Sequence, residues 1–261
     1  MEDDSFVGLI DHDTASLQEV RQLKLSGCGI TAVINVLRIA KHSTAASDVD
    51  IDAMLESASF TLRTRANDAP LAQYLASRGV AGCTGEELIP SLQSIAPHFE
   101  GEFISGHDIA NLTKITGEPL IQFLVKKMQD GWIPVCTLNL QLFGNDAWHH
   151  QAIYGVDTSK RLVHCLNPVT AYEEDVAMKL MTTPSVLLVR RNDILQRLEV
   201  GEGEGGFPLP VPDDDPVYTQ EEWKKLNVKE QIEAACKDES VDFVMIPANY
   251  VGGIAFFRVK K

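Results

Sequence analysis

Helical and strand patterns are segregated along this chain, and this segregation limits the folds it can form. Apolar residues recur at helical spacing from Cys28 to about Ala40 and again from Pro119 to Asp130, where Gly131 ends the helix. Strand patterns dominate later; strands are predicted at 6–10, 132–140, 146–157, 161–166, 185–190, 243–247 and 253–259. A helix-rich first half and a strand-rich second half predict an α+β fold with two lobes.

The remaining elements divide the chain into three parts. Further helices are predicted at 48–57, 69–78, 86–95 and 219–236, a connecting segment with some helical character at 11–24, and a loop at 98–105. Residues 201–216 are rich in glycine, proline and acidic side chains, which is typical of a linker or loop. We therefore expect a main domain over 1–200 and a C-terminal part over 217–261 that packs back on it.

Charge and cysteine usage exclude several classes of protein. The 261 residues carry a net charge of −14, which argues against nucleic acid and anionic membrane surfaces as partners but can steer basic substrates. No apolar stretch is long enough to span a bilayer, and the acidic start, Met1 to Asp4, predicts no signal peptide. Five cysteines without a C-x-x-C pair predict free thiols in a reducing cytosol.

Cys28 is the candidate nucleophile because it falls at the predicted start of a long helix. There the backbone N–H groups and the helix dipole favour a thiolate, and Gly27 and Gly29 leave room for a substrate carbonyl. Gln22 lies six residues upstream, where its amide can stabilise the oxyanion formed when Cys28 attacks. The alternative is that Cys28 is a small buried apolar residue.

Two adjacent histidines are candidates for the base. His149 and His150 begin a predicted strand, so their side chains should point to opposite faces. Asn167 ends the next strand, and an Asn carbonyl can accept the imidazole N–H and orient the ring. Asp157 is a rival for this role, although it lies in the predicted turn between the two strands. The other histidines share no i, i+4 spacing, so no zinc site is expected.

The order of these features resembles a known family. Four features carry the resemblance: Gln22 six residues before Cys28-Gly29, a helix that continues with Ala32 and Val36-Leu37, the helix–Gly–strand pattern over 119–135, and His149 six residues before Gly155 with Asn167-Pro168 following. In this order the chain is similar to the papain-like cysteine peptidase superfamily, closest to its C39-like branch, which includes guanylyl-cyclase-domain-containing proteins.

The resemblance covers about Gln22 to Arg190 and selects His149 over His150. It implies a papain-like fold, in which a helical lobe carries Cys28 and an antiparallel sheet lobe carries His149 and Asn167. It also implies a thiol-dependent peptidase or amide hydrolase acting on a peptide or protein, with no cofactor. A related acyltransferase and a catalytically silent interaction module are the alternatives. Val156 and Trp148 depart from the family pattern, and the segment 78–118 matches no part of it. The oligomeric state is not indicated.

Overall fold

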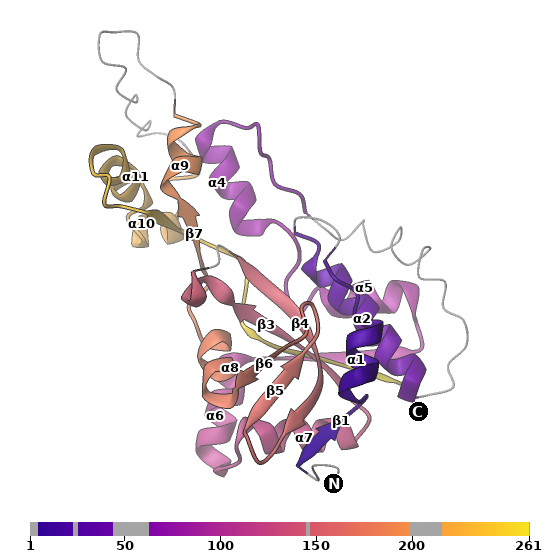
Figure 1. The fold of residues 1–261 in the computed structure, drawn as a ribbon. Coiled ribbons are helices and arrows are strands. Elements are labelled where there is room, and N and C mark those ends of the chain that lie inside the picture. The colour runs from indigo at the N-terminus through magenta and orange to yellow at the C-terminus, as the bar shows by residue number, and fades with distance from the viewer. Residues whose placement is uncertain (1–4, 23–25, 44–62, 145–146, 199–215, 261) are drawn as a thin grey trace, which may run out of the picture.

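The computed structural model describes residues 5–22, 26–43, 63–144, 147–198 and 216–260. The fold is mixed α+β, built on an antiparallel sheet, as the segregated patterns predict. The sheet has the strand order β2-β9-β3-β4-β5-β6, and β1 also pairs with β4 (Figure 1). Its strands are β1 (Phe6–Gly8), β2 (Phe99–Ser105), β3 (Ile133–Asn139), β4 (Trp148–Asp157), β5 (Leu162–Cys165), β6 (Thr170–Glu173) and β9 (Gly253–Val259).

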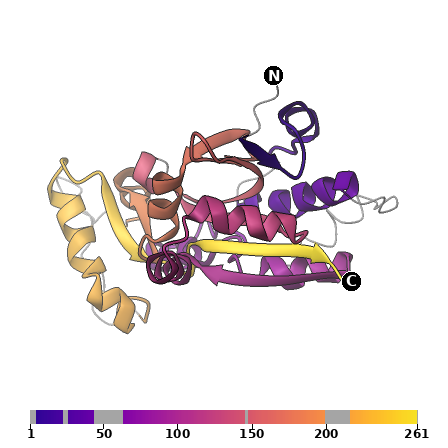
Figure 2. The same cartoon turned by 90° about the horizontal axis from the view of Figure 1, so that it is seen from below.

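Helices cover both faces of this sheet because its central strands are apolar on both sides. In β3 and β9, successive residues, such as Val135 and Cys136 of β3, face opposite layers, as strand geometry requires. One layer contains α1 (His12–Gln18), α2 (Cys28–Ser43) and α5 (Leu88–Ile95). The other contains α6 (Gly106–Thr116), α7 (Leu120–Gln129) and α8 (Glu174–Met181). Figure 2 shows β9 lying alongside β2, with helices around them.

A smaller apolar cluster forms beside the main sheet. It is built on a two-stranded sheet of β7 (Val186–Arg190) and β8 (Phe243–Pro247). Around that sheet lie α4 (Leu71–Val80), α9 (Arg191–Leu195), α10 (Glu221–Lys225) and α11 (Val228–Lys237). Trp148 at the start of β4 belongs to this cluster and is 6% exposed, so it joins the cluster to the main sheet. Among the described helices, none is long and apolar enough to cross a membrane.

Two predicted elements are wrong. Residues 98–105, predicted as a loop, contain β2. This strand pairs over its whole length with β9 (Gly253–Val259), which lies far away in the sequence. Residues 219–236, predicted as one helix, form α10 and α11, because Asn227 adopts a left-handed conformation (φ 50°) that ends the first helix. The predicted helix at 48–57 and nearly all of the linker at 201–216 lie outside the described residues.

Candidate active site

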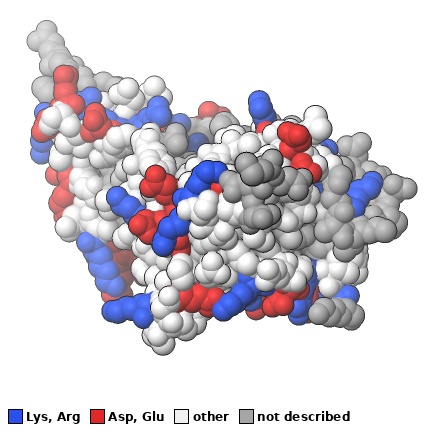
Figure 3. Space-filling model, turned by 60° about the horizontal axis from the view of Figure 1, so that its bottom comes forward, with Lys and Arg blue, Asp and Glu red and all other residues white. Residues whose placement is uncertain are grey.

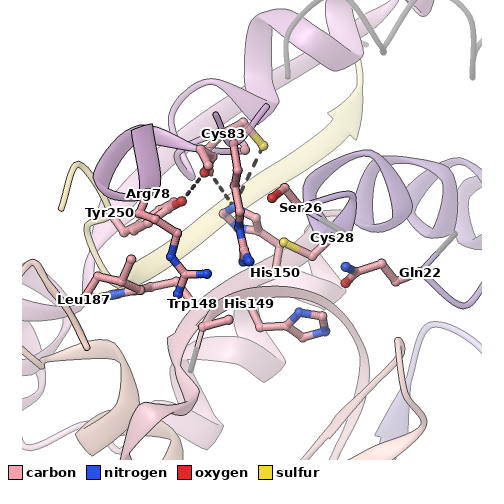
Figure 4. Close-up of a pocket in the computed structure, with 14 residues that line it drawn as sticks. Gln22, Ser26, Cys28, Arg78, Cys83, Trp148, His149, His150, Leu187 and Tyr250 are labelled. Atoms are coloured by element: carbon pink, nitrogen blue, oxygen red, sulfur yellow. Dashed lines mark hydrogen bonds between the residues drawn. The ribbon is translucent and has the colours of Figure 1, made fainter. Parts of the chain in front are cut away.

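A cavity of about 240 Å³ lies where the N-terminus of α2 meets the start of β4 (Figure 4). Gln22, Cys28, His149 and His150 all line it. The fold therefore brings together candidate residues from separate segments of the chain. The other lining residues are Ser26, Arg65, Arg78, Ala81, Gly82, Cys83, Ala147, Trp148, Leu187 and Tyr250.

Cys28 is the first residue of α2, and its side chain is half-buried. Burial raises the pKa of the Cys28 thiol above its ordinary value. Backbone hydrogen bonds from His150, Gly29 and Cys28 itself act in the opposite direction, as does the charge of Arg65, but they do not offset burial. The thiolate predicted from the helix start is therefore not the form that this environment favours, because desolvation outweighs the N–H groups.

His149 is half-buried and is held by the chain that follows β5. Its Nε2 lies 2.6 Å from the backbone carbonyl oxygen of Asn167, so this nitrogen carries the proton in the neutral ring. Burial lowers the pKa of His149, and the bond to Asn167 opposes that shift. Nδ1 has no hydrogen-bond partner among the described residues, and none of their hydrogen bonds joins this ring to Cys28. In Figure 4 the ring lies below Cys28, beside Gln22.

His150 points to different partners, as the strand alternation predicts. Its Nδ1 lies 3.0 Å from Thr137 Oγ1, and its Nε2 lies 2.9 Å from the carbonyl oxygen of Cys83. Only 2% of the residue is exposed, and this burial lowers its pKa to about 4. Because both ring nitrogens are engaged and the ring stays neutral, His150 is a structural side chain in this arrangement.

The buried His150 predicts an acid-sensitive fold. An unfolded histidine gains its proton as the pH falls through about 6.5, whereas His150 in the folded protein stays neutral down to about pH 4. The unfolded state therefore binds more protons in this window, and stability falls as the pH falls. We expect His150 to contribute a loss of about 3 kcal/mol between these limits. Urea unfolding across this range should show a shallower pH dependence in His150→Gln; an unchanged dependence would contradict this role.

Asn167 connects Gln22 to His149, but it does so differently from the expected triad. Its backbone carbonyl accepts from His149, while its side-chain Oδ1 accepts from the backbone N–H of Gln22 at 2.8 Å. Asn167 has a left-handed backbone (φ 71°), a conformation that asparagine tolerates better than most residues. The rival Asp157 accepts hydrogen bonds within its turn from Ser159 and Lys160. Asp157 is therefore a turn residue.

Several lining residues were not anticipated from the sequence. Cys83 follows the end of α4, and its Sγ occupies the space that a side chain on Gly29 would need. Tyr250 follows β8 and stacks on Trp148, with ring centroids 5.8 Å apart. Arg78 lies in the last turn of α4. These residues reach the cavity through contacts between distant segments, so no local sequence pattern marks them.

A comparison with protein-family models finds no match, and no curated protein matches the sequence. The papain-like resemblance therefore remains a prediction.

Proposed function

We propose that this protein is a papain-like, thiol-dependent hydrolase in which Cys28 attacks the carbonyl of a peptide or other amide. The observation that carries the proposal is the shared cavity: Cys28 at the first residue of a buried helix and His149, held by Asn167, line it together with Gln22. A nucleophile at a helix start, an oriented imidazole and an amide donor are the groups that acyl transfer needs.

In the proposed reaction, His149 takes the thiol proton as Cys28 attacks. The raised pKa of Cys28 and the lowered pKa of His149 favour a neutral resting pair, so proton transfer accompanies formation of the C–S bond. The carbonyl oxygen becomes an oxyanion, which the Gln22 amide can stabilise. Cleavage of the C–N bond then passes the proton from His149 to the leaving amine. Water attacks the thioester, releases the acid and restores the thiol.

Two features of the fold support the papain-like part of this proposal. The N-terminus of α2 carries Cys28, and the antiparallel β4–β5 hairpin with its following segment carries His149 and Asn167.

The described cysteines are all free thiols, which supports the cytosol as the proposed location. A peptide or protein is the proposed substrate, and nucleic acid is not proposed as a partner.

A catalytically silent binding module is the second candidate. The observation that favours it is the resting geometry: none of the described hydrogen bonds joins Cys28 to His149, and burial holds the thiol in its protonated form. Catalytic hydrogen bonds in apo enzymes often tighten only when substrate binds, so the hydrolase remains the first proposal.

A chromogenic acyl ester separates the two candidates. With p-nitrophenyl acetate at neutral pH, we expect a burst of p-nitrophenolate close to one equivalent per protein, because Cys28 is acylated faster than the thioester hydrolyses. Cys28→Ser should abolish the burst, and Cys236→Ser, a half-buried cysteine on α11, should retain it. A burst that survives in Cys28→Ser, or the lack of a burst in the unmodified protein, would contradict the hydrolase proposal. Challenging the acyl-enzyme with amines then distinguishes hydrolase from acyltransferase.

A further inference from the structure

Two arginines line the cavity beside Cys28. Arg65 and Arg78 both line it, and no Asp or Glu is present among its described lining residues. The whole chain, by contrast, carries a net charge of −14, and on the face drawn in Figure 3 basic and acidic side chains are interspersed. The local field at the candidate nucleophile therefore does not follow from the overall charge.

The fold fixes Arg78 in this position. Only 2% of Arg78 is exposed, although arginine is rarely buried to this extent. The next residue, Gly79, packs so closely on β8 that a side chain there would lie 2.6 Å from the carbonyl oxygen of Pro247. Tyr250 donates a hydrogen bond to the carbonyl of Ala81, which also ties this end of α4 to the segment after β8. In Figure 4 the Arg78 side chain extends into the cavity toward Trp148.

Both positive charges act on groups inside the cavity. Arg65 lies close enough to Cys28 to oppose the burial-induced rise in the pKa of the thiol. Burial raises the pKa of Tyr250 to about 12, and the charges of Arg65 and Arg78 oppose this rise. An anionic group that entered the cavity would experience the same two charges in a partly desolvated environment, where Coulomb interactions are stronger than in water.

We propose that Arg78, with Arg65, selects substrates that carry a carboxylate close to the scissile carbonyl, such as an acidic peptide. The proposal rests on the function proposed above and names the substrate class of the same site. The planar guanidinium fork of arginine matches a carboxylate in geometry and charge. The aromatic pair Trp148–Tyr250 and Leu187 supply an apolar wall for the rest of that substrate group. This reverses the expectation that the acidic chain selects basic substrates.

The test compares two reagents that differ in charge and alkylate the same thiol. Rates of Cys28 alkylation by iodoacetate and by iodoacetamide are measured by peptide mapping, and each is divided by the rate with N-acetylcysteine under the same conditions. The normalised iodoacetate-to-iodoacetamide ratio should be about tenfold higher at Cys28 than at Cys236, because two arginine charges attract the carboxylate. High salt should reduce this ratio.

Variants assign the effect to the arginines. Arg78→Met should reduce the ratio severalfold, Arg78→Lys should retain part of it, and Arg65→Gln should also reduce it. If Arg78→Met does not fold, as judged by circular dichroism, Arg65→Gln and the salt dependence provide the readout. A ratio at Cys28 equal to that at Cys236, or one unchanged in every folded variant, would overturn the proposal. Because alkylation requires no acyl-enzyme, this outcome is separate from failure of the proposed hydrolase activity.

Discussion

Replacement of His149 by alanine should lower the rate of Cys28 acylation by p-nitrophenyl acetate by about 10²-fold or more. Cys28 is protonated at rest because burial raises its pKa, so attack requires a base at the moment of bond formation. His149 lines the same cavity, has its Nε2 held by Asn167, and has no described partner on Nδ1. Stopped-flow measurement of p-nitrophenolate release at neutral pH gives the rate.

Two histidine variants serve as controls for this prediction. His107 is exposed on α6, so His107→Ala should acylate at the normal rate. His150→Gln retains hydrogen-bonding capacity toward Thr137 and Cys83 and tests whether the buried histidine is the base instead. If His149→Ala acylates normally while a folded His150→Gln does not, the assignment of the base to His149 is wrong.

Replacement of Gly29 by alanine should destabilise the protein by about 2 kcal/mol. Alanine normally stabilises a helix relative to glycine. At this position, however, the added Cβ would lie 2.1 Å from Cys83 Sγ and 3.1 Å from Leu88 Cδ2. The helix or the segment carrying Cys83 must shift, and Cys28 would shift with them. Chemical denaturation gives the free energy of unfolding, and the acylation burst should decrease in the same variant.

A double-mutant cycle separates this overlap from other effects of the substitution. Cys83→Ala removes the sulfur that the new Cβ would meet, although it leaves a small cavity of its own. The free energy of unfolding of the double variant should therefore exceed, by about 1 kcal/mol or more, the value expected from adding the two single effects. Additive effects would show that the contact between Gly29 and Cys83 does not determine the stability of this region.

The correctly predicted parts of the fold are those whose pattern lies within one short segment of the sequence. Helix α2 has continuous helical apolar spacing, and α7 ends at Gln129, two residues before Gly131, whose left-handed φ of 84° suits a glycine that follows a helix. The β4–β5 hairpin can be predicted because its turn residues directly follow an apolar strand. By contrast, β2 combines apolar residues with Glu100 and Glu102 and is stabilised by pairing with β9, which its own sequence does not reveal.

The site shows the same division between local and distant determinants. The placement of Cys28 at a helix start and the opposite directions of His149 and His150 follow from helix and strand geometry. The protonation of Cys28 depends on how deeply the surrounding chain buries its thiol. No local sequence pattern indicates this burial, because it is created by contacts between distant segments. Gly29 was interpreted as leaving room for substrate, but the structure shows that it accommodates Cys83.

Peptide mapping after brief treatment with p-nitrophenyl acetate and acid quench tests the central claim most directly, because it locates the acyl group. We expect one acetyl group on the peptide that contains Cys28, its loss after incubation in water, and a strongly reduced yield in His149→Ala. Acetylation confined to Cys236 or to lysine side chains, with Cys28 unmodified in the folded protein, would contradict the assignment of Cys28 as the nucleophile.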